Sequence, residues 1–284
     1  MQKIRDSVKI SVGQNASELS RGLLSIAVSS GKGGTGKTNV VANLAFAFTQ
    51  LHKNVLILDG NLGLSNIGGL LGLTSSYNVE HILNNQKSIE EVLLKGPGGM
   101  SILPASPGNE KLVNLSAGEK IYLLEELEQI AHNFDVLLID TGPGISPNVM
   151  FFNSVVEESI VVTTSEFTSI FAAYILIKVM ATKYKKTRFK ILVNFAKIEQ
   201  EAKETFKIII RLADAYLCSL SLDYLGFIPF DEMLKQAVKR HRLVAEIYPQ
   251  SPLNQRFKEI AHYFIDSHAQ TIWKRPVPRT QAVQ

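Results

Sequence analysis

Near its start the chain carries a glycine-rich segment from Gly31 to Thr38, which reads Gly-Lys-Gly-Gly-Thr-Gly-Lys-Thr. An apolar, β-branched stretch (residues 23–30) precedes it, and an apolar stretch with helical character (residues 40–48) follows it. The pattern Gly-x-x-x-x-Gly-Lys-Thr between a strand and a helix predicts a phosphate-binding loop. Glycines let main-chain N–H groups close around phosphate oxygens, and the positive end of the next helix faces the same anion.

The loop pattern also assigns chemistry to single side chains. We expect Lys37 to reach the β- and γ-phosphates of a nucleotide and the Thr38 hydroxyl to bind Mg²⁺. The residues predicted to contact the nucleotide here are Gly31, Lys32, Gly33, Gly34, Thr35, Gly36, Lys37, Thr38 and Asn39. A turn that merely joins a strand to a helix is the alternative, but the full match and its flanks argue against it.

Short β-branched or leucine-rich runs recur along the whole chain. They lie at residues 23–30, 54–59, 100–103, 134–140, 159–164, 189–194 and 222–228. Such runs are typical of strands covered by helices on both faces. Helical segments separate them, two of which begin with a capping-box spacing at Ser88 and Ser116. The alternation predicts an α/β fold, a single domain with a doubly wound, mostly parallel sheet.

Composition narrows the classes of protein further. One large domain at residues 22–267 accounts for most of the 284 residues, with a polar leader at 1–21 and a tail at 268–284. The single cysteine, Cys218, excludes an intrachain disulfide and offers no thiolate pair for zinc or an iron–sulfur cluster. A net charge of +4 excludes a polycationic tail, and no zinc-finger or helix-turn-helix pattern indicates sequence-specific DNA binding.

The sequence also bears on cellular location. We find no signal peptide, and the longest uncharged apolar run, residues 167–177, falls short of the roughly 20 residues that cross a bilayer. We therefore expect a cytoplasmic protein with at most a peripheral membrane contact on the inner face of the cell membrane.

Two of the predicted strands end in aspartates, Asp59 and Asp140, at the sheet edge where ligands bind in α/β folds. A carboxylate at that edge can hold Mg²⁺ or its bound water, and a glycine just after it can offer its N–H to the γ-phosphate. We assign these roles to Asp140 and Gly142, with Asp59 as a second metal candidate. For either aspartate, the alternative is a side chain that only caps the next turn.

The second lysine inside the loop, Lys32, points to a family. The run from Lys32 to Thr38 resembles the deviant phosphate loop of the MinD and ParA ATPases, P-loop NTPases of the SIMIBI type. The resemblance implies ATP and Mg²⁺ as cofactors and an ATP-dependent homodimer. In that dimer the extra lysine, here Lys32, crosses to the partner's phosphates. The alternative is a solvated surface lysine.

The segment at residues 59–67 resembles switch I of the same family, with one substitution. The family uses a second aspartate there to orient the attacking water, and this chain has Asn61. An amide can hold water but is a very poor base. The resemblance gives Lys32, Lys37, Asn61 and Asp140 as the catalytic set, and Asn61 predicts hydrolysis that is slow or needs a stimulating partner. A nucleotide-binding but catalytically silent paralogue stays open.

Further stretches, at residues 96–105, 144–146 and 168–178, resemble the flagellar-number regulators called FlhG or FleN, which are MinD relatives. That family implies two partners, a flagellar GTPase of the signal-recognition-particle type and a flagellar transcription activator. It also implies that Asn194 contacts adenine, although a strand-end amide can simply satisfy its own turn. The chain departs from the family at Phe167 and Ala172, where Pro and Asp are usual, and residues 14–20 keep only part of the family's activation motif.

Basic residues keep a rival function open, a ParA-like partition ATPase that moves on nonspecific DNA. One group lies between Lys178 and Lys190, and a second between Lys235 and Arg242; each could also be a solvated surface. A helical stripe spans residues 253–273, and most of it is expected to pack on the sheet. Ile272 and Trp273, next to Lys274, have the character of a weak membrane anchor.

Overall fold

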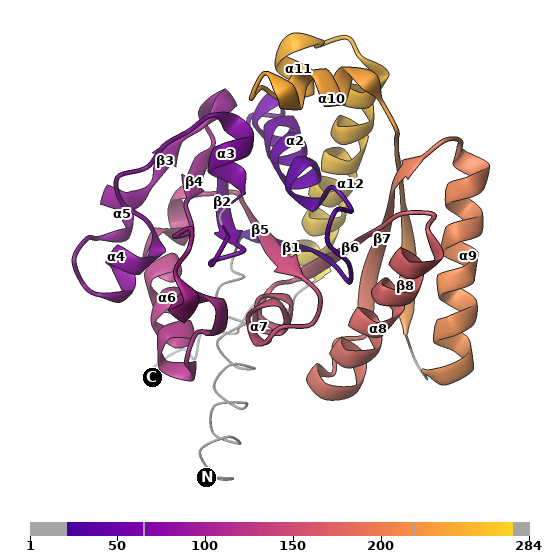
Figure 1. Ribbon diagram of the computed structural model, residues 1–284, viewed down its shortest axis with the longest axis horizontal. Coiled ribbons are helices and arrows are strands. Elements are labelled where there is room, and N and C mark those ends of the chain that lie inside the picture. The colour runs from indigo at the N-terminus through magenta and orange to yellow at the C-terminus, as the bar shows by residue number, and fades with distance from the viewer. Residues whose placement is uncertain (1–21, 65, 218–219, 275–284) are drawn as a thin grey trace, which may run out of the picture.

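In the computed structural model, which describes residues 22–64, 66–217 and 220–274, the strands form one sheet in the order β3-β4-β2-β5-β1-β6-β7-β8 (Figure 1). The strands are β1 Leu24–Ser30, β2 Val55–Gly60, β3 Leu94–Lys95, β4 Ser101–Leu103, β5 Val136–Pro143, β6 Glu158–Thr163, β7 Arg188–Ala196 and β8 Ser221–Pro229. Neighbouring strands are parallel except for β3, which pairs antiparallel with β4. The mostly parallel, doubly wound α/β domain is therefore confirmed.

Helices cover both faces of this sheet. They are α2 Lys37–Gln50, α3 Ile67–Leu71, α4 Val79–Leu83, α5 Ile89–Val92, α6 Ala117–Ile130, α7 Pro147–Val155, α8 Phe167–Tyr184, α9 Glu199–Tyr216, α10 Glu232–Lys239, α11 Val244–Ile247 and α12 Pro252–Lys274, with 3₁₀ turns at Pro97–Gly99, Glu110–Asn114 and Ala131–Asn133. On one face, a hydrophobic core packs α2 and α12 against the sheet. On the other face, one core packs α6 and α7 against the sheet, and a separate core packs α8 and α9 against it. Both capping boxes are present, at Ser88 and Ser116.

The chain ends differ in how far the structure describes them. The leader at residues 1–21 lies outside the described residues, as does Cys218. Helix α12 buries Phe257, Ala261 and Phe264 against α2 and the sheet, which confirms that most of its apolar stripe is core. The helix continues through residue 268 to Lys274. The side chains of Ile272 and Trp273 lie outside the described part, and Arg275 lies beyond it.

Helix α8 is longer than its uncharged apolar run. The helix continues beyond residues 167–177, past Lys178 and Lys183, and ends at Tyr184. Within the described residues, α8 alone is long and apolar enough to cross a bilayer. A core helix meets the same criterion. The inner face of α8, with Ile170, Leu176 and Met180, is buried against the sheet.

A buried hydrogen-bond network fixes the middle of the sheet below the phosphate loop. Asn153 of α7, fully buried, donates to the Ser29 hydroxyl of β1 at 2.7 Å and accepts from Ser159 of β6 at 3.0 Å. Ser29 also pairs with the Thr141 hydroxyl of β5 at 2.9 Å. Because buried polar groups are costly to leave unpaired, this network holds three strands and a helix in one register. The carboxyl ends of β1, β5 and β6 therefore meet at one edge of the sheet.

Candidate nucleotide-binding site

The phosphate loop connects the buried strand β1 to helix α2, as predicted. Gly34 and Gly36 have positive φ angles of 80° and 84°, which favour glycine, and Gly36 forms the N-cap of α2. A Cβ on Gly36 would collide with the side-chain amide of Asn194, and one on Gly31 would collide with the backbone carbonyl of Ala172 in α8. The loop is thus enclosed by β7 and α8. Space requires glycine at position 31, conformation favours it at position 34, and both apply at Gly36.

Three predicted site residues meet at the start of α2. The Thr38 hydroxyl donates to Asp140 Oδ2 at 2.7 Å, across 102 positions of sequence. Asp140 and Lys37 are both buried, with 1% and 8% of their surface exposed. Burial lowers the pKa of the Lys37 ammonium, while the Asp140 charge opposes that shift. Burial raises the pKa of the Asp140 carboxyl to about 7, against the opposing influence of Lys37.

Two buried oxygens beside this cluster fit a bound Mg²⁺–nucleotide. Among the described residues, Asp140 Oδ1 and Thr35 Oγ1 are buried and have no hydrogen-bond partner. Buried polar atoms in that condition are costly and often mark a ligand site. Carboxylate and hydroxyl oxygens are the ligands that Mg²⁺ prefers. The donor set of Thr38 and Asp140 therefore fits Mg²⁺ next to a phosphate-binding loop.

Asp59 lies directly beside Asp140, because the two face each other in the β2–β5 register. Its Oδ2 accepts hydrogen bonds from the backbone N–H groups of Asn66 and Ile67 at 2.9 and 3.3 Å. Asp59 therefore caps the start of α3, as the alternative interpretation of this aspartate predicted. Asn61 lies against Gly142, since a Cβ on that glycine would meet the Asn61 amide oxygen at 3.1 Å. The structure thus brings the switch-I amide next to the strand-end glycine. The metal role of Asp59 stays a prediction.

Lys32 is engaged within its own chain. Its ammonium forms an ion pair with Glu166 at 2.7 Å and donates to the Thr168 hydroxyl at 3.0 Å, both at the start of α8. The side chains of Lys32 and Glu166 are 44% and 68% exposed. Exposed pairs of this kind contribute little to stability, typically about 1 kcal/mol or less. Lys32 is therefore neither free in solvent nor fixed in place.

Asn194 contacts the phosphate loop itself. Its amide nitrogen donates to the Thr35 carbonyl at 2.7 Å, and its oxygen accepts the N–H of Phe195 at 3.0 Å. Phe195 has a positive φ of 60°, and its ring meets that of Phe230 edge to face at 6.4 Å. Asn39, the last residue predicted to contact the nucleotide, lies in the first turn of α2, and its carbonyl accepts from the Asn43 side-chain amide. The predicted adenine contact of Asn194 stays a prediction.

Sequence reasoning missed several residues of this region. Glu166 was not singled out, although an acid directly before a long apolar helix is a usable signal. The aromatic pair Phe195 and Phe230 carries no sequence pattern that separates it from core residues. The two rings come together only because β7 and β8 are paired in parallel and end at the same edge of the sheet.

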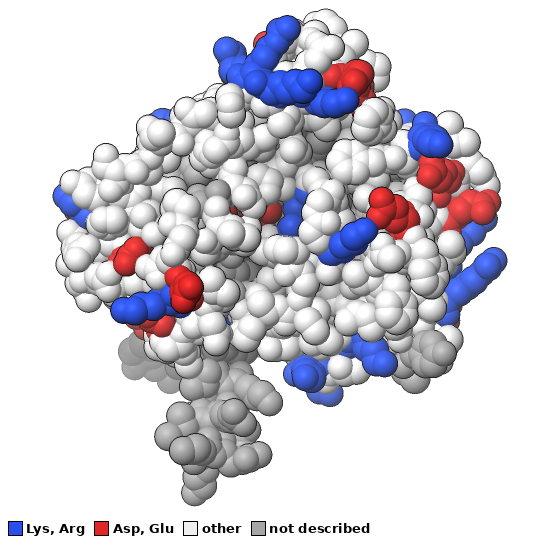
Figure 2. All heavy atoms as spheres, in the orientation of Figure 1, with Lys and Arg blue, Asp and Glu red and all other residues white. Residues whose placement is uncertain are grey.

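The two basic groups predicted from the sequence differ in burial and in their partners. In the first group Lys190 is buried and Lys186 is half-buried, so this group does not form one solvated or binding face. Lys186 donates to the carbonyls of Asn153 and Val156, where burial lowers its pKa to about 8, and Lys190 pairs with Glu158 and Asp223. The second group lies on α10 and the turn that follows it, at the top of Figure 2. There Lys235 and Arg242 pair with neighbouring glutamates, as expected of a solvated surface.

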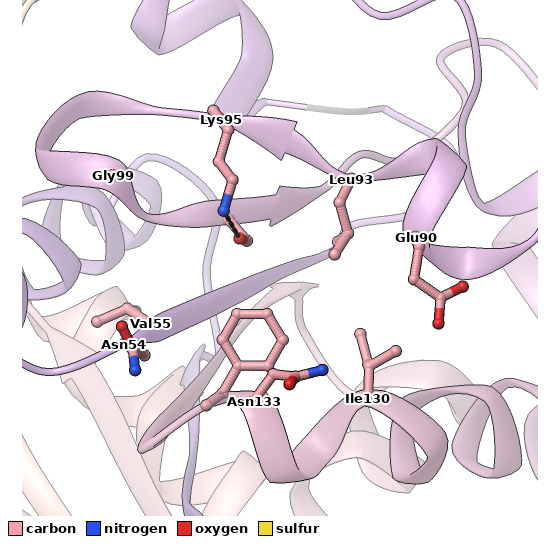
Figure 3. Close-up of a pocket in the computed structure, with 10 residues that line it drawn as sticks. Asn54, Val55, Glu90, Leu93, Lys95, Gly99, Ile130 and Asn133 are labelled. Carbon is pink, nitrogen blue, oxygen red and sulfur yellow. Dashed lines mark hydrogen bonds between the residues drawn. The ribbon is translucent and has the colours of Figure 1, made fainter.

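A separate hollow of about 310 Å³ lies away from the phosphate loop, near the amino ends of β2 and β4 (Figure 3). Val55, Leu93, Ile130 and Phe134 belong to its apolar lining, and at its β3–β4 side Lys95 donates to the Ser101 hydroxyl at 3.0 Å. Its lining shares no residue with the predicted site. This hollow is therefore not part of the predicted nucleotide site, which lies at the opposite, carboxyl edge of the sheet.

Comparisons with known proteins agree with this geometry. The ParA family model, described as NUBPL iron-transfer P-loop NTPase, matches residues 24–265. The antiactivator FleN of Pseudomonas aeruginosa is 40% identical over 83% of this chain and 84% of its own length. The flagellum site-determining protein YlxH of Helicobacter pylori is 28% identical over 83% of this chain and 80% of its own length.

Among solved structures, the septum site-determining protein MinD of Pyrococcus horikoshii, complexed with Mg-ADP, matches with a TM-score of 0.71. The match is 22% identical in sequence and covers 89% of this chain and all of that one, which is a likeness of fold. The deviant phosphate loop, the parallel sheet and the extent of these matches lead to one conclusion. The chain belongs to the ParA/MinD family of P-loop NTPases.

Proposed function

We propose that this chain is a MinD-like switch, dependent on ATP and Mg²⁺, that regulates the number or placement of flagella. The observation that carries the proposal is the 40% identity to the antiactivator FleN over 83% of the chain. An iron-transfer role, named in the description of the family model, has little support because the sequence has a single cysteine.

The residues of the site each have a task in this proposal. Bound Mg²⁺ and ATP supply the reactive phosphoanhydride and neutralise its charge. The loop N–H groups and the α2 N-terminus orient the phosphates, and Lys37 stabilises their negative charge. Thr38 and Asp140 hold the metal. Because Asp140 and Lys37 are buried, their interactions with a bound ligand are weakened little by solvent.

Dimerisation is the step that would turn nucleotide binding into a signal. The ATP-bound state joins two copies across their phosphate loops, with Lys32 reaching the partner's phosphates. For that, the Lys32 ammonium must leave Glu166 and Thr168, which it contacts within its own chain. The small stability of an exposed pair makes the exchange inexpensive. The joined copies then recruit flagellar partners, a GTPase and a transcription activator, at the cytoplasmic face of the membrane.

A ParA-like partition function on nonspecific DNA is the second candidate. Its support is the exposed part of the first basic group, at Lys178, Lys183, Lys185 and Arg188. Lys190 is buried and ion-paired, and the half-buried Lys186 donates to backbone carbonyls, so less charge is available to bind phosphates, which disfavours this function.

Deletion of the gene in its native host tests the proposed process. We expect cells with extra or misplaced flagella, counted by electron microscopy, and restoration of the normal number by the wild-type gene. A Lys37→Ala copy, which lacks the phosphate-binding ammonium, should fail to restore it. Unchanged flagella in the deletion strain would contradict the flagellar function and favour the DNA-based candidate.

The crossing role of Lys32 is tested with Lys32→Ala. This variant should bind a fluorescent ATP analogue as the wild type does, because Lys37, Thr38 and Asp140 are untouched, but it should no longer dimerise with ATP in light-scattering measurements. Lys239→Ala, which removes an exposed charge from α10, is the matched control and should dimerise normally. ATP-dependent dimers of Lys32→Ala would show that the contact across the loops does not need this lysine.

The prediction of slow ATP hydrolysis is tested at Asn61. Asn61→Asp should raise the rate of ATP hydrolysis about tenfold or more, because a carboxylate orients and polarises the attacking water better than an amide does. Phosphate release under single-turnover conditions measures the chemical step directly, and Asn66→Asp in the same segment serves as a control for added charge. An unchanged rate in Asn61→Asp would mean that positioning and electrostatics alone set the turnover.

A further inference from the structure

Helix α3, Ile67–Leu71, begins where the segment that resembles switch I ends, and its own sequence stabilises it poorly. The helix has five residues, and two of them are the glycines Gly68 and Gly69. Helices of this length do not form in isolation, and glycine is less favourable in a helix than any residue except proline. The position of α3 therefore depends on its contacts with the rest of the fold.

The amino end of α3 is attached to the nucleotide site. Asp59 Oδ2, at the end of β2, accepts the N–H groups of Asn66 and Ile67. Asn61 lies on the connection between Asp59 and α3, and its amide oxygen lies against Gly142. The connection that carries Asn61 is thus held between the end of β2 and the start of α3.

The carboxyl end of α3 contacts a part of the chain that is distant in sequence. The Gly69 carbonyl accepts a hydrogen bond from Nδ1 of His241 at 2.8 Å, across 172 positions of sequence. Because a carbonyl can only accept, Nδ1 carries the proton. The C-cap residue Gly72 packs on the same histidine, since a Cβ on this glycine would lie 3.1 Å from the His241 Cβ. His241 therefore holds the carboxyl end of α3.

The turn between α10 and α11 presents the His241 ring to α3. His241 has a φ of 53°, a left-handed conformation that is uncommon for residues other than glycine. Its N–H donates to the Val238 carbonyl at 3.0 Å, and the N–H of Arg242 donates to the Ala237 carbonyl at the same distance. Leu243, which follows the turn, is buried in the core that contains α2. The turn is therefore anchored on both sides of the histidine.

The two polar ends of α3 do what its apolar side chains cannot do. Ile67 and Leu71 are buried and keep α3 on the core, but apolar burial has no preferred direction. Hydrogen bonds require a particular geometry. The contacts with Asp59 and His241 therefore determine the orientation of α3.

We propose that His241 is a positioning residue for ATP hydrolysis, because its hydrogen bond to α3 keeps the Asn61 amide where it can orient the attacking water. The inference rests on the proposed function, which gives Asn61 this role, and it adds a residue from outside the phosphate loop and switch I. The phosphates and the metal are assigned to Lys37, Thr38 and Asp140, on α2 and β5. His241 therefore acts on the rate of the chemical step and not on the affinity for ATP.

The test compares the wild type with His241→Gly and His241→Asn by phosphate release under single-turnover conditions. Glycine suits the left-handed conformation but removes the donor, so we expect the hydrolysis rate to fall about fivefold, the loss that one ordinary hydrogen bond causes. The affinity for a fluorescent ATP analogue should not change. Asparagine tolerates the same conformation and keeps an N–H donor close to the position of Nδ1, so His241→Asn should restore the rate.

The matched control is His52→Gly. His52 has a similar φ of 59° and is exposed in the turn between α2 and β2, at the opposite end of β2 from Asn61. This variant makes the same substitution in the same backbone conformation, and it should hydrolyse ATP at the wild-type rate.

A second variant tests the route through α3. A Cβ on Gly69 meets no atom within 4 Å, and alanine favours the helix, so Gly69→Ala stabilises α3 without help from the histidine. Combined with His241→Gly, it should recover most of the hydrolysis rate.

Two results would overturn the inference. One is a His241→Gly variant that binds ATP and hydrolyses it as fast as the wild type. The other is failure of both His241→Asn and the combination with Gly69→Ala to restore the rate, because the ring would then act by a route other than α3. A wild type that binds no ATP would contradict the proposed function, and this inference with it.

Discussion

The site depends on one hydrogen bond between distant parts of the chain, from the Thr38 hydroxyl at the start of α2 to the Asp140 carboxylate at the end of β5. It joins the phosphate loop to the strand that carries the carboxylate proposed to bind the metal. The Asn153 network beneath it fixes the register of β1, β5 and β6. Without that register the loop, the carboxylate and switch I would not meet at one edge of the sheet.

The same cluster explains why the site is suited to a polyanion with its metal. Lys37 and Asp140 are buried together with Asp59, and each loses hydration that a ligand could replace. Burial shifts the pKa of Lys37 down and that of Asp140 up, which is the direction expected when both charges are held out of water. Bound phosphate and Mg²⁺ would favour the charged forms of both side chains. Binding of Mg²⁺ and phosphate would thus offset the free-energy cost of burying these two charged side chains.

Much of this was predictable from sequence, and for identifiable reasons. The glycine pattern and the strand-end Asp140 have fixed relations to a parallel sheet, so their meeting follows from topology. The short strand β3 was not predicted, because two residues carry no periodicity. The internal contacts of Lys186 and Lys190 could not be predicted for a different reason, because their partners on α7, β6 and β8 are distant in sequence. The Lys32–Glu166 pair likewise arises only when the phosphate loop packs on the backbone of Ala172.

The most direct test of the account is calorimetric titration of the chain with ATP, with and without Mg²⁺, for the wild type and for Asp140→Asn. The account predicts one ATP per chain, tighter binding with Mg²⁺, and loss of most of that Mg²⁺ dependence in Asp140→Asn, because the variant lacks the carboxylate that holds the metal. Equal Mg²⁺ dependence in the two proteins would contradict the role given to Asp140. Absence of ATP binding by the wild type would contradict the account as a whole.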